Sequence, residues 1–376
     1  MKSLREYALI ALVLWLDTVS FAAYFFASRA YVRDSLGELE AYRYVALLVG
    51  FEGIASLAAP LGGVLGDVYG RRAVALLSLL RAPVYLSIPI VTAYDPRLLF
   101  VPAFVGGVFS NIFYSNALGV LLHRARGSGR VYATVTMVFP LAWSVGSVIP
   151  GLLEPLGGYT LIFSSVGATA LLASLLLALL GDNNSSGARY RDALDSLSAL
   201  PKSLLAGLLL AGAGLTLYWN LLSIKLYEVT ESLLVFGLVG GTLTTIASTI
   251  ARPIAGVVAD KLNPVRLLTV AYAAYLVYGL LLYHVSGLLF LALWVLPLYP
   301  FREIAQTMAV SRSLPRSLQN TAAGVVTLTY SLPATAYPLF YMAGYGLEEG
   351  LLVYVATLAI SVLVLLTRIA RESGGG

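Results

Sequence analysis

Long hydrophobic runs alternate with short polar breaks along the whole chain. Most runs hold 20 or more residues, and a helix rising 1.5 Å per residue needs about 20 to cross roughly 30 Å of hydrocarbon. The first run, from Tyr7, has no small-residue cleavage site, so we do not interpret it as a signal peptide. The pattern predicts about twelve transmembrane helices, over residues 7–28, 42–65, 73–93, 98–122, 131–152, 158–181, 203–226, 232–258, 264–284, 287–309, 319–343 and 347–368.

The composition favours a membrane protein. Of the 376 residues, 59% are hydrophobic and only 11% are charged, whereas soluble domains contain roughly 25% charged residues. A soluble chain of this length would fold as two or three domains, and so few charges could not supply their polar surfaces. Cysteine is absent, which excludes disulfides, thiolate nucleophiles and thiolate metal sites.

Basic residues are distributed unequally between the two predicted sides of the membrane. Of the 24 lysines and arginines, sixteen lie on the side of the N-terminus and five on the other side, while Arg81, Arg252 and Arg302 fall inside hydrophobic runs. Cytoplasmic loops are enriched in lysine and arginine. We therefore expect a multi-pass protein of the plasma membrane with both termini in the cytoplasm.

The longest polar stretch divides the chain near its middle. We expect an N-terminal six-helix bundle over residues 1–181, a cytoplasmic linker over 182–202 and a C-terminal six-helix bundle over 203–376. The three-residue spacing of Leu194, Leu197 and Leu200 allows a short amphipathic helix in the linker, on the membrane surface.

One motif occurs twice, 193 residues apart. Residues 63–72 read GVLGDVYGRR after the second run, and residues 256–263 read GVVADKLN after the eighth. Repetition at half the chain length predicts two homologous bundles related by an axis along the membrane normal. Within the motif, Gly63 permits close helix approach, Asp67 can cap the next helix, and Gly70 and Asn263 suit a turn with positive φ.

The first copy resembles the signature loop of the major facilitator superfamily. The second copy lies where that family repeats this loop motif in its second half. The resemblance implies an all-α membrane protein with two pseudo-symmetric six-helix bundles around a central cavity, alternating between inward-open and outward-open forms. It also implies gating roles for Gly63, Asp67, Gly70, Arg71, Arg72, Arg252, Gly256 and Asp260. The second copy lacks the paired arginines.

Two further family patterns bear on the direction of transport. The glycines and prolines of residues 146–158 loosely resemble the pattern on the fifth helix of exporters. In contrast, residues 100–122 contain no arginine, although proton-coupled drug exporters often carry one on their fourth helix.

Ionisable residues inside hydrocarbon are costly unless paired or hydrated, which makes them candidates for function. Asp17, Glu52 and Arg81 lie near the predicted midplane. Asp17 is the first candidate for proton coupling, because burial would favour its protonated form, and Glu52 is the second. The alternative for Asp17 is a permanent pair with Arg81 that supports helix packing.

The family lines its cavity with helices one, four, seven and ten. This implies a set of substrate-binding candidates, namely Asp17, Tyr24, Asn111, Tyr114, Trp219, Asn220, Arg302 and Glu303, with Asn116 and Gln306 as further cavity positions. Arg302 and Glu303 are adjacent, so they point about 100° apart on a helix and should have separate partners. Arg252 lies beside the second motif, which favours a gating role over substrate binding.

These features favour a secondary active transporter that moves a small organic molecule by alternating access, coupled to protons and directed toward efflux. Uptake of a sugar, organic acid or peptide remains an alternative, as do a channel and a non-transporting receptor on the same scaffold. An enzyme is disfavoured, because the hydrophobic runs hold no convergent nucleophile, base or metal constellation. The expected partners are a small-molecule substrate, protons or another coupling ion, and the lipid bilayer. We expect a monomer without cofactor, metal or nucleic acid.

Overall fold

The computed structural model describes residues 2–36, 38–180, 190–198, 200–230, 238–343 and 347–374. Within these ranges the regular secondary structure consists of helices, and no strand occurs. Ten helical stretches of the described chain are long and apolar enough to cross a membrane.

The first half of the chain forms helices that match the first six predicted runs. They are α1 (Lys2–Leu36), α2 (Glu38–Ala55) with α3 (Ala58–Tyr69), α4 (Arg71–Leu77) with η1 (Ser78–Leu80) and α5 (Arg81–Tyr94), η2 (Pro96–Leu99) with α6 (Phe100–Ala125), and α7 (Gly129–Val135) with α8 (Val138–Leu180).

The second half forms helices that match the other six runs. They are α10 (Lys202–Thr230), the π-helical turn η3 (Leu238–Leu243) with α12 (Thr244–Lys261), α13 (Pro264–His284), α14 (Gly287–Trp294) with α15 (Tyr299–Ser313), η4 (Arg316–Leu318) with α16 (Gln319–Ser331), η5 (Leu332–Ala336) and α17 (Tyr337–Met342), and α18 (Leu347–Gly374).

Two local breaks explain why ten candidate stretches correspond to twelve crossings. The stretch Gly129–Leu180 has 52 residues, and a straight helix of that length would be about 78 Å long, too long for one crossing. It breaks at Gly158, whose φ of +58° and ψ of −161° are not helical and favour glycine. The other break is η5, which interrupts the crossing formed by α16 and α17. The prediction of about twelve transmembrane helices is therefore confirmed over the described ranges.

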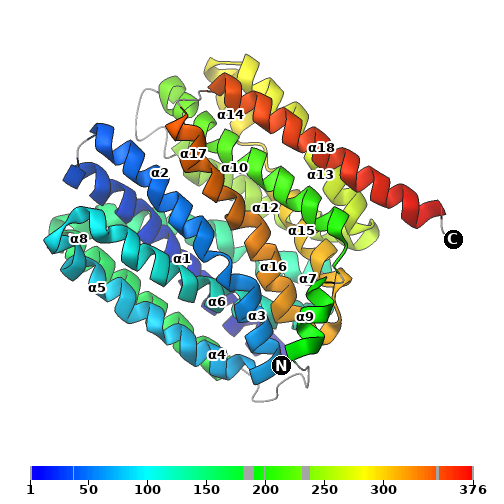
Figure 1. Ribbon diagram of the computed structural model, residues 1–376, viewed down its shortest axis with the longest axis horizontal. Coiled ribbons are helices and arrows are strands. Elements are labelled where there is room, and N and C mark those ends of the chain that lie inside the picture. Colours follow the sequence, from blue (N-terminus) through cyan, green and yellow to red (C-terminus); the bar gives the residue numbers. More distant parts are fainter. Residues whose placement is uncertain are drawn as a thin grey trace.

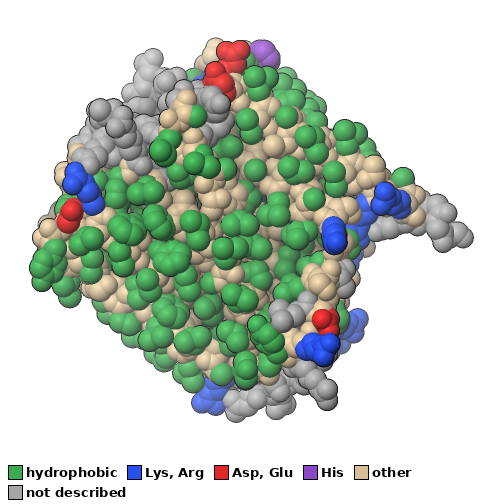
Figure 2. Space-filling view, viewed as in Figure 1, with side chains coloured by type: hydrophobic (Ala, Val, Ile, Leu, Met, Phe, Trp, Pro, Cys, Tyr) green, Lys and Arg blue, Asp and Glu red, His purple; other side chains and the backbone are tan. Residues whose placement is uncertain are grey.

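The helices form two groups side by side. Figure 1 shows the N-terminal half in blue to cyan next to the C-terminal half in green to red. Within the halves, α1 packs along α8 and α10 packs along α18. Gly146 of α8 permits the first of these contacts, because a Cβ atom there would lie 2.6 Å from the Ala22 Cβ. On the face in Figure 2, hydrophobic side chains cover the middle of the bundle and charged side chains lie toward its ends, as a bilayer requires.

A short helix, α9 (Tyr190–Ser198), lies between the two halves along the chain. Its Leu197 packs, as does Val68 of α3, against a small apolar cluster formed by Val64 of α3 and Leu318 of η4. The predicted linker over 182–202 is described only in part, since residues 182–189 and 199 lie outside the described ranges and the side chain of Leu194 is not described.

Candidate functional site: a gate between the halves and a central cavity

Each motif aspartate binds the first turn of a helix in the other half. Asp67 of α3 accepts hydrogen bonds from the backbone amide of Thr321 (2.8 Å), from its hydroxyl (2.7 Å) and from the amide of Asn320 (3.3 Å). These residues begin α16, whose own N-cap residue, Leu318, has no side-chain acceptor. A carboxylate at this position satisfies amides that the helix leaves unbonded and interacts favourably with the helix dipole.

The second copy repeats this geometry at α7. Asp260 of α12 accepts hydrogen bonds from the backbone amides of Gly129 (2.6 Å) and Arg130 (3.0 Å) and from the hydroxyl of Ser128 (3.0 Å). Arg312 of α15 lies 3.3 Å from the same carboxylate and supplies an arginine at the second copy, which lacks the paired arginines of the first. We call the end of the bundle that holds Asp67 and Asp260 the signature end.

The motif glycines bring the backbones of the two halves into contact at the signature end. A Cβ atom on Gly63 would overlap the carbonyl oxygen of Asn320 and lie 2.7 Å from the Cα of Thr321. A Cβ atom on Gly256 would lie 2.6 Å from the Cβ of Ala133 and 2.7 Å from the carbonyl oxygen of Gly129. The prediction of close helix approach at Gly63 is confirmed, and the approaching helix belongs to the other half.

The sequence did not predict the partner of Asp67, whose carboxylate points across the interface to α16. The expectation of a positive φ at Asn263 is wrong. Asn263 has a φ of −61° and instead caps α13 by accepting from the amide of Val265. Gly70, with φ +89°, does have the expected positive φ. Arg72 is exposed, and the side chain of Arg71 is not described.

A cavity of about 910 Å³ lies between the two halves. Both halves line it, with side chains of α1, α2, α5, α6 and α8 from the first and of α10, α12, α13, α15 and α16 from the second. Seven charged residues are among them, namely Asp17, Arg29, Glu52, Arg81, Arg252, Arg302 and Glu303. The cavity has the size and mixed apolar and polar lining of a site for a small organic molecule.

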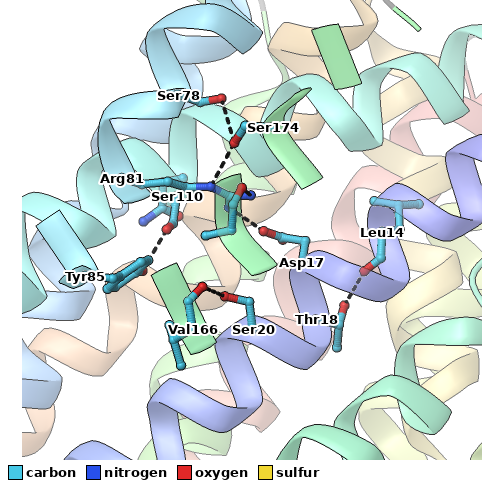
Figure 3. Close-up of polar contacts among 12 residues, drawn as sticks. Leu14, Asp17, Thr18, Ser20, Ser78, Arg81, Tyr85, Ser110, Val166 and Ser174 are labelled. Atoms are coloured by element: carbon cyan, nitrogen blue, oxygen red, sulfur yellow. Dashed lines mark hydrogen bonds and ion pairs between the residues drawn. The ribbon is translucent and has the colours of Figure 1, made fainter. Parts of the chain in front are cut away.

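Asp17 and Arg81 form a buried ion pair on the cavity wall (Figure 3). The arginine is also held by α8, since its Nε donates to the Ser174 hydroxyl (3.1 Å) and its Nη2 donates to the Ala170 carbonyl (3.0 Å). Its guanidinium lies 3.7 Å from the ring centroid of Phe113. Arg81 is therefore fixed by several partners, whereas the only charged partner of Asp17 among the described residues is Arg81.

A second ion pair joins α1 to α2. Arg29 donates to both carboxylate oxygens of Glu52, at 2.8 and 2.5 Å, and Tyr24 donates to the same carboxylate at 3.2 Å. The sequence counts Arg29 among the five basic residues on the side opposite the N-terminus, beyond the end of the first predicted run. In the structure α1 continues to Leu36, and Arg29 lines the cavity.

A third ion pair lies within the second half and contacts the first. Arg252 of α12 and Glu303 of α15 are 2.6 Å apart and almost fully buried. Tyr132 of α7 donates to the Glu303 carboxylate (2.6 Å), and Arg252 donates to the hydroxyl of Thr136 (2.7 Å). The Arg252–Glu303 pair, bound to Tyr132 and Thr136, therefore connects the two halves. This geometry suits a gating role better than a role in substrate binding.

Arg302 differs from the other cavity arginines. It has no carboxylate partner among the described residues, and its guanidinium lies 5.0, 5.3 and 5.7 Å from the ring centroids of Tyr330, Tyr299 and Tyr275. Arg302 and Glu303 thus have separate partners, as their adjacent positions on one helix predict.

Comparison with known proteins identifies the family. A family model described as the Major Facilitator Superfamily matches residues 10–338. The chain belongs to the Major Facilitator Superfamily. A search of the curated proteins found no match.

Solved structures of transporters share the superfamily fold. The human organic anion transporter MFSD10 aligns with a TM-score of 0.70 and 18% identity, and a bacterial homologue of the iron transporter ferroportin, in an outward-facing state, with 0.71 and 17%. The E. coli fucose:proton symporter FucP aligns with 0.70 and 14%. Each alignment covers 96% of this chain and 98% of the other.

Most of the residues predicted to face the superfamily's cavity do line it. They are Asp17, Tyr24, Asn111, Tyr114, Trp219, Arg302 and Glu303, together with Glu52, and the side chain of Asn220 is not described. Asn116 and Gln306 do not line the cavity. Asn116 is fully buried and donates to the Gly62 carbonyl (3.1 Å), and Gln306 donates to the Thr329 hydroxyl (2.8 Å).

Several cavity residues were missed by the sequence interpretation. Besides Arg29 they are mainly aromatic, namely Tyr132, Trp143, Tyr275, Tyr278, Trp294, Tyr299 and Tyr330. A usable signal was present on α13, where Tyr272, Tyr275 and Tyr278 recur every three residues and so share one side of the helix.

Proposed function

We propose that this protein is a secondary carrier that binds a small organic molecule in the central cavity and moves it across the membrane by alternating access. The observation that carries the proposal is the paired closure at the signature end, beside a cavity that both halves line. Gly63, Asp67, Gly70, Arg71, Arg72, Arg252, Gly256 and Asp260 are the proposed gating residues.

The chemistry of the closure supports a reversible gate. Asp67 and Asp260 hold the halves together through hydrogen bonds to backbone amides. When such a cap separates, water can replace the carboxylate at the amides and the amides at the carboxylate, so each cap contributes only about 1 kcal/mol. Two caps can therefore be exchanged for other contacts during a transport cycle without unfolding either half.

We propose that the pair of Asp17 and Arg81 couples transport to protons. Arg81 remains anchored to Ser174, Ala170 and Phe113 whether or not Asp17 is charged. Protonation of Asp17 would leave the buried guanidinium without its counter-ion, at a cost of about 3–5 kcal/mol. Proton binding would thus be favoured only in a state that hydrates Arg81 or brings another anion to it, which links protonation to conformation. Glu52 is the second candidate, through its pair with Arg29.

We place the protein in the plasma membrane, as a monomer, with the signature end and both termini in the cytoplasm. The unequal distribution of basic residues supports this orientation, and Figure 1 has both chain ends toward the end that carries α3 and α9. The glycines and prolines of residues 146–158, among which Gly146 permits the contact of α8 with α1, support efflux. Uptake of an organic acid or sugar by the same cavity is the alternative.

The test is a flux measurement in proteoliposomes with an imposed pH gradient. Candidate drugs, sugars, amino acids and organic acids are first ranked by the thermal stability they give the purified protein, since a ligand of the folded form raises it. We expect saturable flux of the best ligand, driven by the gradient and accelerated by the same compound on the opposite side. Asp17→Asn should abolish the dependence on the gradient, and the exposed carboxylate variant Asp195→Asn should not.

Each failure of this experiment rejects a different part of the proposal. Flux that ignores the pH gradient in the unmodified protein would reject proton coupling. Flux without saturation or acceleration from the opposite side would indicate a channel, because only an alternating site gives trans-stimulation.

A further inference from the structure

The charges around the cavity do not balance. Its lining contains four arginines and three carboxylates. Three of the arginines have a carboxylate partner, in the pairs Asp17–Arg81, Glu52–Arg29 and Glu303–Arg252. The remaining cation, Arg302, has none among the described residues, so the lining as a whole has one formal positive charge in excess.

Unsatisfied hydrogen-bond donors lie at the same place. The Nε of Arg302 and the hydroxyl of Tyr330 are both buried and have no hydrogen-bond partner among the described residues. The two groups belong to α15 and α16, and the guanidinium lies 5.0 Å from the Tyr330 ring centroid. Buried donors are normally satisfied, which indicates that an acceptor is missing here. Arg29 and Arg252 also have an unpaired Nε, but their charges are already compensated.

A flat apolar wall lies beside these donors in the same half. Trp219 of α10 contacts Trp294 (5.1 Å between ring centroids) and Tyr278 (5.6 Å), and all three rings line the cavity. Trp219 also lies 6.2 Å from Tyr275, one of the rings around Arg302. The wall and the cation are therefore neighbours that one molecule could contact together.

We propose that the substrate is an organic anion, with one acidic group bound by Arg302 and Tyr330 and an apolar, preferably aromatic, body against Trp219. This inference rests on the proposed carrier function and adds the chemical class of the cargo. A carboxylate suits the site because it can accept two parallel N–H bonds from a guanidinium and a further bond from a tyrosine hydroxyl.

Other classes of cargo fit the cavity less well. A cation would have to compete for carboxylates that already have arginine partners, and the described residues include no group of three or more metal-ligating side chains. A neutral sugar would leave the charge of Arg302 uncompensated. The tyrosine rings around Arg302 stabilise its charge by cation–π contact but do not neutralise it.

The test compares matched acids, amides and amines on the purified full-length protein by isothermal titration calorimetry. The probes are benzoate, 2-naphthoate and indole-3-acetate, each with its neutral primary amide and the corresponding arylalkyl amine. We expect at least one acid to bind about tenfold or more tightly than its amide and its amine. Only the acid supplies a negatively charged acceptor for the unpaired donors of Arg302 and Tyr330.

Variants tie this preference to the proposed residues. Arg302→Gln should abolish the preference for the acid, Arg302→Lys should retain part of it, and Tyr330→Phe should weaken acid binding about fivefold. Arg191→Gln, which removes an exposed arginine on α9, is the matched control and should change nothing. An unaltered thermal unfolding midpoint shows that each variant is folded.

The proposal is overturned if no acid binds, if an amide or amine binds as tightly as its acid, or if the acid preference survives in Arg302→Gln. Proteoliposome counterflow separates this result from the carrier function. Counterflow of a neutral or cationic compound, without acid binding, would retain the carrier and reject the anion site. Acid binding without counterflow of any compound would retain the anion site and reject the carrier.

Discussion

Gly63 controls how closely α3 can approach α16. A methyl group at this position would meet the carbonyl oxygen of Asn320 and the Cα of Thr321, which are backbone atoms that cannot move without moving α16. The same two residues donate to Asp67. Glycine at 63 and aspartate at 67 thus depend on each other, because the carboxylate reaches the amides only when the backbones are in contact.

We expect Gly63→Ala to weaken closure at the signature end. Overpacking typically costs about 1–3 kcal/mol, and a loss of about 1.4 kcal/mol would speed hydrogen exchange at the amides of Asn320 and Thr321 about tenfold. Hydrogen–deuterium exchange with mass spectrometry measures this rate. The control is Gly151→Ala in α8, where an added Cβ has no neighbour within 4 Å. Equal protection in both variants would contradict the role given to Gly63.

Single functional residues could be predicted where a charged residue lies within a long hydrophobic run. Asp17, Glu52 and Arg81 are conspicuous in runs that contain almost no other charge, and all three line the cavity. Their partners were harder to predict, because the faces that two helices turn toward each other depend on packing and not on spacing along the chain. Arg29 shows this, since its partner Glu52 lies on another helix and the apolar pattern of the first run ends before the helix does.

The linker helix α9 contacts the signature end. Leu197 packs against the cluster formed by Val64 of α3 and Leu318, directly before α16. Because α3 and Leu318 belong to different halves, Leu197 can contact both only while the signature end is closed. We therefore expect α9 to stabilise the closed state by a modest amount.

Leu197→Ser should release α9 from this surface. A half-buried leucine contributes about 1 kcal/mol, so we expect cleavage by trypsin after Arg191 to become about fivefold faster. Mass spectrometry of the products measures the rate at that bond. Ser198→Ala changes the exposed neighbouring residue and serves as the control. If cleavage is already as fast in the unmodified protein as in Leu197→Ser, α9 does not depend on this contact.

Helices were predicted more completely than their interruptions. Each predicted run has a helical counterpart in the described chain, because the length of an apolar run depends mainly on bilayer thickness. The crossings formed by α2 with α3 and by α14 with α15 are broken at residues 56–57 and 295–298. Only the second break contains a proline, Pro297, so the local sequence offers a signal for one break and not for the other.

The whole molecule has the same contact twice. Asp67 reaches from the first half to α16 in the second, and Asp260 reaches from the second half to α7 in the first. The repeated motif predicted two related bundles, but not that each motif would bind the opposite bundle, because that partner is set by how the halves pack. Both contacts lie at the signature end. While they are formed the cavity can open only at the opposite end, and after they separate it can open at the signature end.

A disulfide across the signature end tests this account directly. The chain has no native cysteine, and a Cβ atom on Gly129 would lie 3.0 Å from that of Ala259 in the other half, so a disulfide requires these two Cβ atoms to move apart by only about 0.5–1.5 Å. The control joins Ala22 to Gly146, whose Cβ atoms would lie 2.6 Å apart within one half.

The decisive measurement is proteoliposome counterflow of the highest-ranked ligand with Gly129→Cys/Ala259→Cys, before and after oxidation and again after reduction. We expect oxidation to abolish counterflow and reduction to restore it, while oxidation of Ala22→Cys/Gly146→Cys leaves counterflow unchanged. Full counterflow through the oxidised Gly129→Cys/Ala259→Cys protein would contradict transport by opening and closing of the signature end.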